Sequence, residues 1–303
     1  ERTVDLISHM TLEEKVGQMT QITLGVIGSG DTVFSSGYSF ELDTVRLYKA
    51  LVKYNVGSVL NTTNNYAMPP EQWHSIISKI QEVATNQTRL KIPVIYGIDA
   101  IHGVTYTDGA IIFPQQITLA ASFNPVHAYN MGVVTAYETR ASGIPWNFSP
   151  VLDLGADPRY SRIYESFGED PYLIGEMGVQ LMKGYEGLSA DSLSSAVKVA
   201  SCLKHFLGYS VPVSGKDRTP AFIPDNVLRE YHLEPFKKAI EAGASSIMIN
   251  SGLINGVTVH ASHEIITKLL KEELGFEGVV VSDWNDIINL HTRDKIAATN
   301  REA

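Results

Sequence analysis

Short apolar runs alternate along this chain with longer segments in which apolar residues recur every three or four positions. Runs of strand length and composition fall at 18–24, 56–60, 92–98, 144–151, 197–203, 245–249 and 279–281. The unbroken run Val279 to Val281 predicts a strand that is buried on both faces. It ends abruptly in the polar and aromatic group Ser282, Asp283 and Trp284.

Amphipathic helices are predicted between these strands. Thr11 and Glu14 form a capping-box pattern that opens one helix, with Leu12, Val16 and Met19 on one face. Two further segments, 42–54 and 124–137, also have apolar residues at helical spacing, namely Leu42, Val45, Tyr48 and Val52 in the first and Val126, Tyr129, Val133 and Tyr137 in the second.

Two helices are predicted to begin at proline, one at Pro69-Pro70 and one at Asp170-Pro171. The stripe of the first indicates core packing and consists of Trp73, Ile76, Ile77, Ile80, Val83 and Ala84. Helices that alternate with strands in this rhythm indicate βαβ units and a parallel sheet.

The expected fold is therefore α/β, a (β/α)8 TIM-type barrel that lacks its last strand and helix. About seven strands are predicted, whereas a closed barrel has eight. A doubly wound open sheet is the competing fold and usually carries a glycine-rich turn that opens a helix after its first strand. Here Gly25 to Gly30 opens no helical pattern, and we expect residues 25–37 to form a loop.

Composition narrows the function classes. The net charge of −9 and the pI near 5.5 argue against nucleic acid as the main partner. No apolar run approaches the roughly 20 residues that span a bilayer. Cys202 is the single cysteine, and its apolar neighbours favour a small buried side chain over a nucleophile. We expect one catalytic barrel domain over residues 1–303, with a processed N-terminus and a cut C-terminus.

Polar residues stand at the ends of nearly all the predicted strands. In a barrel these ends converge on one pocket, and such a group suits a ligand with many hydroxyls. Each residue alone is also explained as a helix cap, a loop ion pair or a solvated side chain, and Asp283 and Asp286 are both candidates to cap the helix that follows. The strand-end residues are Asn61, Asp99, Asp153, Lys204, His205, Asn250, Asp283 and Trp284.

Several segments resemble, in order, the signature motifs of glycoside hydrolase family 3, and above all its β-glucosidase and exo-β-glucanase branch. They span most of the chain and comprise Gly97-Ile98-Asp99-Ala100-Ile101-His102-Gly103, Phe113-Pro114-Gln115, the stretch from Asp157 to Asp170 with Arg162 and Glu165, Lys204-His205-Phe206-Leu207-Gly208-Tyr209 and Ser282-Asp283-Trp284. The resemblance implies a barrel followed by a C-terminal α/β sandwich domain.

The resemblance also implies a retaining mechanism in which Asp283 is the nucleophile. It implies that Arg162 and Lys204 hold this carboxylate ionised. The sugar-binding residues that it implies are Asp99, Arg162, Lys204, His205, Met248 and Trp284. Asp217 and Arg218 are further candidates for the pocket lining, and no metal or other cofactor is implied.

In this branch the general acid/base is a glutamate of the following domain, so no residue of this chain takes that role. Glu165 and Glu169 are expected to pair within their loop. The expected partners are a β-glucoside or oligosaccharide substrate and the missing domain, on the same or another chain. The expected location is secreted or periplasmic. No histidine occurs in 208–224, which disfavours the N-acetylhexosaminidase branch, and Asn250-Ser251-Gly252 replaces a tyrosine often found there.

Two other functions remain open on the sequence. Lys204 at a strand end also fits an aldolase-type barrel that forms a Schiff base. A chain cut at its end also fits a non-catalytic sugar-binding fragment. An incomplete barrel leaves sheet edges exposed, so we expect pairing through that edge or with a separate chain.

Overall fold

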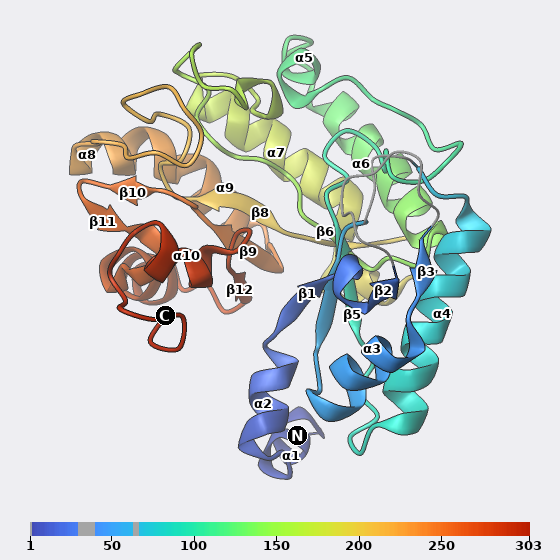
Figure 1. Ribbon diagram of the computed structural model, residues 1–303. Helices are drawn as coiled ribbons and strands as arrows, with labels where there is room; N and C mark the ends of the chain where they lie inside the picture. Colours follow the sequence, from blue (N-terminus) through green and yellow to red (C-terminus); the bar gives the residue numbers. More distant parts are fainter. Residues whose placement is uncertain (1, 30–39, 63–66) are drawn as a thin grey trace. The chain divides into compact units, whose positions relative to one another are not determined.

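The computed structural model describes residues 2–29, 40–62 and 67–303 (Figure 1). The chain divides into two compact units. The first comprises Glu1–Ala100, Val104–Ile111 and Glu138–Asn147, and the second comprises Ile101–Gly103, Ile112–Tyr137 and Phe148–Ala303.

The first unit contains parallel strands that pair in the order β1 (Gln21–Thr23), β4 (Ser58–Leu60), β5 (Ile95–Ile98) and β6 (Trp146–Asn147). Between β1 and β4 the chain also forms a short antiparallel pair of strands, β2 (Gly28–Ser29) and β3 (Glu41–Leu42). Its helices are α1 (Arg2–Ser8), α2 (Leu12–Gln18), α3 (Thr44–Tyr48), which continues as a π-helical turn over Lys49–Lys53, and α4 (Pro70–Gln87).

The second unit contains parallel strands that pair in the order β8 (Leu203–Phe206), β9 (Ser246–Ile249) and β12 (Val279–Val281). Strand β7 (Ala200–Ser201) precedes β8, and β10 (Leu253–Ile254) pairs antiparallel with β11 (Val257–Thr258). The helices are α5 (Gln116–Ala120), most of α6 (Pro125–Ala141), α7 (Pro171–Glu186), α8 (Asp225–Val227), α9 (Glu234–Glu241) and α10 (Asp286–Thr292), with π-helical segments at Leu228–Leu233 and Glu264–Glu273.

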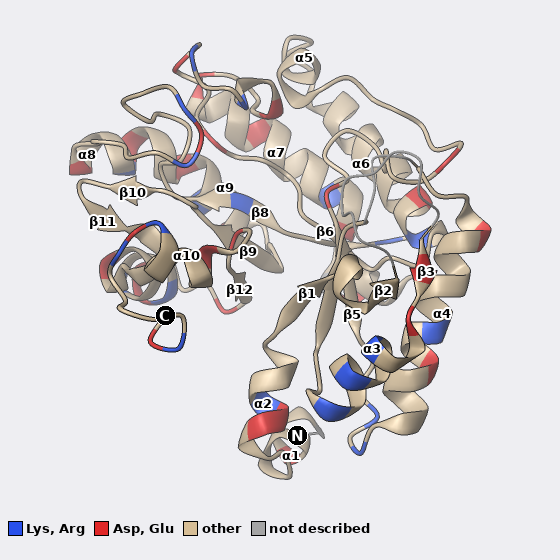
Figure 2. Ribbon diagram, viewed as in Figure 1, with Lys and Arg blue, Asp and Glu red and all other residues tan. Residues whose placement is uncertain are grey.

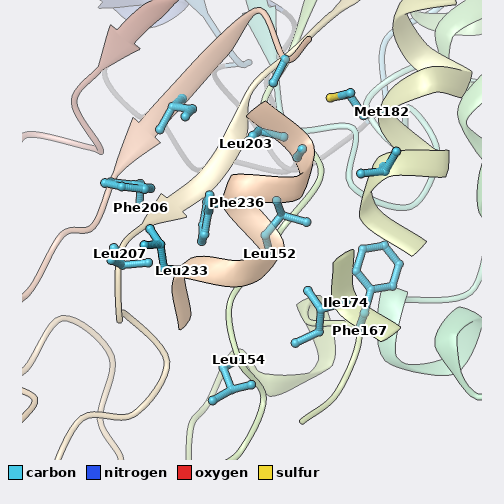
Figure 3. Close-up of a cluster of buried hydrophobic side chains, with 14 of the residues drawn as sticks. Leu152, Leu154, Phe167, Ile174, Met182, Leu203, Phe206, Leu207, Leu233 and Phe236 are labelled. Carbon is cyan, nitrogen blue, oxygen red and sulfur yellow. The ribbon is translucent and has the colours of Figure 1, made fainter. Parts of the chain in front are cut away.

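The core of the second unit lies between its strands and the pair α7 and α9, which run alongside one another (Figure 1). Figure 3 shows aromatic and aliphatic side chains from β8, α7 and α9 gathered in this core, among them Leu203, Phe206, Ile174 and Phe236. Phe206 and Phe236 meet edge to face with ring centroids 5.3 Å apart. Strand β8 is thus anchored in apolar packing while its other residues face the polar site.

Several predicted helices are confirmed, together with their predicted caps or buried faces. Thr11 and Glu14 make the reciprocal capping box at the start of α2. Asp170 caps α7 by accepting from the amides of Tyr172 and Leu173. Every residue of the predicted α4 stripe is buried, from Trp73 to Ala84, as expected for a helix whose apolar residues all lie on one side.

In three other helices the apolar residues singled out from the sequence do not all pack inward. Leu12, Val16 and Met19 of α2 are exposed, as are Val45 of α3 and Tyr137 of α6. These helices carry a second set of apolar or small residues at the same spacing, and that set packs inward. The buried residues include Gly17, Leu47, Leu51, Ala128, Met131 and Ala136.

The sequence predicted that strand β12 is buried on both faces, and this prediction is wrong. Val279 is 60% exposed, and Val280 and Val281 are half-buried. Within the described part of the chain β12 pairs with β9 alone, so one side of the strand lacks the packing that a central strand receives. The residues that follow it still lie at the end of a parallel strand.

The boundaries of two strands, which were predicted at 144–151 and 197–203, also differ from the prediction. Residues 148–153 run beside β8 without forming a regular strand: Leu152 donates to the Lys204 carbonyl at 2.7 Å, and Lys204 donates to that of Pro150 at 3.1 Å. Pro150 has no backbone N–H and cannot donate to the hydrogen-bond ladder of a sheet, which keeps this segment from forming a regular strand. Lys204 and His205 lie within β8 and do not follow it.

Four other features bear on the function classes. Within the expected loop 25–37, residues 30–37 lie outside the described residues, and the preceding Leu24–Ile27 form a 3-10 turn that opens no α-helix. No helix among the described residues has the length and apolarity needed to cross a membrane. Figure 2 shows charged positions on α3 and α4, while β1, β10 and β11 are uncharged. Cys202 is fully buried between β7 and β8.

Candidate active site

The polar residues of the second unit meet because its strands are parallel and in register. Val281 of β12 lies opposite Met248 of β9, and Phe206 of β8 lies opposite Ile249. The carboxyl ends of β9 and β12 therefore fall at one edge of the sheet, with Asn250 and Asp283 just beyond them.

Asp283 is buried and makes contacts that differ between its two carboxylate oxygens. Oδ1 accepts from Nη2 of Arg218 at 3.2 Å and from the amide of Trp284. Oδ2 has no hydrogen-bond partner among the described residues, and Nε2 of His205 lies 3.9 Å from it. One oxygen is thus held in place, and the other is a buried acceptor without a hydrogen-bond partner among the described residues.

Helix capping does not explain Asp283. Helix α10 begins at Asp286, and its N-cap residue is Asn285, whose φ of 58° is left-handed and whose side chain makes no cap hydrogen bond. Asp283 contributes only its carbonyl, which accepts from the Asp286 amide at 3.2 Å. The carboxylate of Asp283 therefore does not cap α10.

The guanidinium that contacts Asp283 is Arg218, while Arg162, which was expected to hold this carboxylate ionised, makes no ion pair with it among the described residues. Arg162 instead forms a two-point pair with Glu165, from Nε and Nη2 at 2.8 Å each. Burial acts to lower the pKa of Arg162, but the Glu165 carboxylate outweighs it and holds that pKa above its usual range. The expected pairing of Glu165 within its loop is confirmed.

His205 forms a buried pair with Asp153. Nδ1 of His205 lies 2.8 Å from Oδ2 of Asp153, and the His205 amide donates to Oδ1 at 3.1 Å. Burial lowers the pKa of His205 to about 3 and raises that of Asp153 to about 7, because an ion is poorly solvated there. Asp153 thus fixes the ring whose Nε2 faces Arg162 at 3.4 Å and Asp283.

Lys204 is buried in the same strand, and the charge of its ammonium acts on two carboxylates, Asp153 and Glu165. In each case it favours the ionised carboxylate. A lysine set among carboxylates suits hydrogen bonding to a polar ligand and gives the Schiff-base alternative no support, because that chemistry favours an apolar or cationic surrounding.

Two tyrosines complete the wall beside His205, and the sequence alone did not single them out. The Tyr209 ring packs on His205 with centroids 4.6 Å apart, and its hydroxyl donates to Oδ1 of Asp217 at 2.6 Å. Tyr160 donates to the same oxygen at 3.2 Å. Burial raises the pKa of both hydroxyls well above the usual value, so they remain hydrogen-bond donors at any physiological pH.

Arg218, left open as a pocket-lining candidate on the sequence, is the connecting residue of the site. Its Nη1 donates to Oγ of Ser251 at 3.0 Å and to the Trp284 carbonyl at 3.2 Å, and its Nε lies 3.7 Å from Asp217. It lies in an irregular loop at a φ of 59°, where no periodic pattern marks its importance. The signal was the motif itself, Lys216-Asp217-Arg218.

The remaining predicted sugar-binding residues lie in different places. Met248 is buried in β9, and Trp284 is 40% exposed beside Asp283, as a residue that stacks on a sugar ring must be. Asp99 follows β5 in the first unit, where Asn61 donates to its Oδ2 at 2.9 Å and accepts from its amide at 3.2 Å. No cluster of three metal-ligating side chains occurs in residues 2–29, 40–62 and 67–303.

Known proteins match this chain over nearly its whole length. The model of the glycosyl hydrolase family 3 N-terminal domain matches residues 11–303. A lysosomal beta glucosidase of Dictyostelium discoideum is 41% identical over 309 residues, which cover 99% of this chain and 37% of that protein.

Solved structures are similar as well. The beta-glucosidase of Listeria innocua superimposes with a TM-score of 0.85 at 28% identity, covering 99% of this chain and 39% of that one. The exo-1,3/1,4-beta-glucanase of a Pseudoalteromonas species gives 0.83 at 31% identity, covering 94% and 34%. The chain thus spans less than two fifths of these relatives, and its fold is the TIM-type barrel of the matched domain.

Proposed function

The chain belongs to glycosyl hydrolase family 3, and from that premise we propose that it is the nucleophile-bearing domain of a retaining β-glycoside hydrolase that releases terminal glucosyl units. The observation that carries the proposal is the asymmetry of Asp283. Arg218 and the Trp284 amide hold Oδ1, while Oδ2 has no partner among the described residues.

In the proposed reaction Oδ2 of Asp283 attacks the anomeric carbon of the terminal sugar. The glycosidic C–O bond breaks through an oxocarbenium-like transition state, and the leaving oxygen takes a proton from a general acid. Water then attacks the same carbon and gives a proton to the conjugate base of that acid, the bond between the anomeric carbon and Oδ2 of Asp283 breaks, and the sugar leaves with its original anomeric configuration. Arg218 beside Oδ1 stabilises the carboxylate in both its attacking and its leaving role.

The general acid is proposed to come from outside these 303 residues. The buried or half-buried carboxylates beside Asp283 in the second unit are already bound by other side chains: Asp153 by His205, Glu165 by Arg162, Asp217 by Tyr209, and Asp286 by Arg293. The relatives are more than twice as long as this chain, which leaves room for a further domain on the same or another chain.

The sugar is proposed to lie against the residues named by the family motifs. Asp99 and Lys204 bind its hydroxyls, Arg162 and His205 form the polar wall beside Asp283, and Met248 and Trp284 give the apolar contacts. Charged groups strengthen hydrogen bonds to hydroxyls, so a sugar with a full set of equatorial hydroxyls, such as glucose, fits this group best. Residues 1–303 are proposed to act as one catalytic domain.

A location outside the cytoplasm is proposed from the relatives. Their printed names include a lysosomal beta glucosidase and a periplasmic beta-glucosidase of Salmonella typhimurium, which is 29% identical over 94% of this chain.

Trapping of the covalent intermediate tests the function. The 303-residue chain is incubated with 2,4-dinitrophenyl 2-deoxy-2-fluoro-β-glucoside, whose leaving group departs without a general acid. Intact mass spectrometry should show one added fluoroglucosyl group, and peptide mapping should place it on Asp283. Asp283→Asn should give no adduct, while Asp225→Asn, an exposed aspartate at the start of α8, should react like the parent chain.

The absence of an adduct at saturating reagent would contradict the proposal. Calorimetry with glucose then decides whether the chain is a sugar-binding domain without chemistry, because binding without labelling supports that alternative.

A further inference from the structure

Three titratable or charged side chains connect to Asp283 from the segments around it: His260, Asp286 and Arg293. Those of His260 and Asp286 are buried, and that of Arg293 is half-buried. We infer that they form a positioning network that fixes Asp283 at two points, its backbone amide and its Oδ1 atom. The inference rests on the proposed role of Asp283 as nucleophile and assigns to these three residues the task of holding it.

The first branch of the network runs through His260, which lies in the short helical turn Val259–Ala261. Its Nε2 accepts a hydrogen bond from the Asp283 amide at 3.2 Å. A neutral imidazole that accepts at Nε2 carries its proton on Nδ1. Nδ1 faces Oδ2 of Asp286 at 3.7 Å, and neither atom has a hydrogen-bond partner among the described residues.

This gap is longer than a hydrogen bond, yet the two orphan atoms face each other within a buried site. Hydrogen bonds in ligand-free catalytic sites are often long and tighten on binding. Burial lowers the pKa of His260, and the charge of Arg293 acts in the same direction, whereas the charges of Asp286 and Asp283 and the backbone of Asn250 act to raise it. The neutral ring that results is the form that can accept from Asp283.

The second branch runs through Arg293, which follows α10. Its Nη2 lies 3.3 Å from Oδ1 of Asp286, and its Nη1 donates to Oγ of Ser251 at 3.3 Å. The same hydroxyl oxygen accepts from Nη1 of Arg218 at 3.0 Å, and Arg218 reaches Oδ1 of Asp283. A hydroxyl has two acceptor lone pairs, so Ser251 can receive both guanidinium groups at once.

Asp286 is the origin of both branches, and its position rules out a direct role in catalysis. Its side chain is fully buried. Its Oδ1 lies 3.3 Å from Nη2 of Arg293 and accepts from Nδ2 of Asn289 at 2.8 Å, and its Oδ2 faces His260. A carboxylate enclosed in this way cannot reach a sugar, but it can fix the groups that touch Asp283.

The two branches leave Asp283 a single free acceptor. Its amide is held by His260, and its Oδ1 is held by Arg218, so Oδ2 alone remains to approach the anomeric carbon. Reactions of this kind are sensitive to placement, and an error of about 1 Å can cost about a hundredfold in rate. Rigid support behind the reacting group is the usual means of preventing it.

Labelling kinetics test the network in the full 303-residue chain, with the fluoroglucoside described above. His260→Leu removes the acceptor and should lower the maximal labelling rate about tenfold to a hundredfold, while the reagent concentration for half-maximal rate changes by less than about threefold. His260→Gln, which places an acceptor oxygen near the Nε2 position, should recover much of that rate. His263→Leu, an exposed histidine three residues away, is the matched control and should have no effect.

A His260→Leu chain that labels at the parent rate would overturn the inference. So would a loss confined to reagent binding, or a Gln variant that is as slow as the Leu variant, since a general packing defect predicts those results.

A spectroscopic measurement keeps the test independent of activity. In the 15N-histidine-labelled chain, the His260 resonances are assigned by their loss in His260→Gln. They should show a neutral ring protonated at Nδ1 at pH 7.5, and Asp286→Asn should shift the Nδ1 signal. A ring protonated at Nε2 or at both nitrogens refutes the network, whatever the labelling shows. If the parent chain is not labelled but His260 has the expected tautomer, the proposed function fails and the network stands.

Discussion

Replacing Asp153 by Asn tests the buried pair that it forms with His205. Burial raises the pKa of Asp153 from 3.8 to about 7 and lowers that of His205 from 6.5 to about 3. Between pH 4 and 6.5 the folded pair therefore holds one proton. The unfolded chain also holds one, on His205, because its Asp153 has ionised. Proton binding is equal in the two states, and the pair gives stability no pH dependence in this range.

The Asp153→Asn chain loses this balance. Its folded state holds no proton at these two positions, whereas the unfolded state keeps one on His205 up to its usual pKa of 6.5. The unfolded state then binds one proton more, so stability rises with pH by about 1.4 kcal/mol per unit. From pH 4.5 to 6.5 the gain relative to the parent chain is about 2.5 kcal/mol, because the slope falls as the pH approaches 6.5.

The converse variant should have the opposite slope. In His205→Gln the folded state keeps the proton of Asp153, while the unfolded state has lost it above pH 3.8. Relative to the parent chain, stability should then fall by about 1.4 kcal/mol per unit. The double variant should run parallel to the parent. His232, whose pKa burial lowers to about 4, titrates in all four chains and cancels in the differences.

Urea unfolding followed by tryptophan fluorescence at pH 4.5, 5.5 and 6.5, at constant ionic strength, gives the four curves. Parallel curves for Asp153→Asn and the parent chain, within about 0.5 kcal/mol, would refute the reasoning. They would mean that Asp153 and His205 titrate in the folded chain as they do in the unfolded one.

Two further predictions concern the first unit. Leu47→Ala, on the inward face of α3, should lower the free energy of unfolding by about 2–5 kcal/mol. Val45→Ala, on the exposed face, should change it by less than about 0.5 kcal/mol. Equal losses of the two variants in urea unfolding would contradict the assignment of faces. Hydrogen bonds from Arg89 lower the pKa of Glu14 to about 2 from 4.5, so Glu14 stabilises the fold above pH 4.5 and loses this effect as the pH falls towards 2. Thermal unfolding of Glu14→Gln should therefore show a lower melting temperature than the parent chain at pH 6 and a smaller difference at pH 3, and a difference that does not shrink would count against the pairing with Arg89.

The helices show which part of the fold the sequence could predict. In α4 the apolar residues lie on one side only, so periodicity identified both the helix and its buried face. In α3 two sets compete: Val45 and Tyr48 have the spacing of a buried stripe, but Leu47 and Leu51 have it too, and tertiary packing chose the second. Periodicity predicts a helix in both cases and cannot decide between two apolar faces.

The site divides in a similar way. Asp283 and Lys204 were found because a charged group in or directly after an apolar strand is conspicuous in sequence. Arg218 and His260 come from a loop and a single helical turn, where nothing in the pattern of apolar residues marks a position. Their roles depend on which atoms meet after folding, and a contact between residues 260 and 283 leaves no trace in local sequence.

The buried thiol of Cys202 gives the chain a built-in reporter. It is the single cysteine, and it lies two residues before Lys204, beside the strand on which the polar site is built. A thiol reagent can modify it only when that strand separates from its neighbours, so the modification rate measures how often the second unit opens. Ligands that bind at the site should slow this reaction in proportion to their occupancy, which would allow uncoloured and unreactive sugars to be ranked without any turnover.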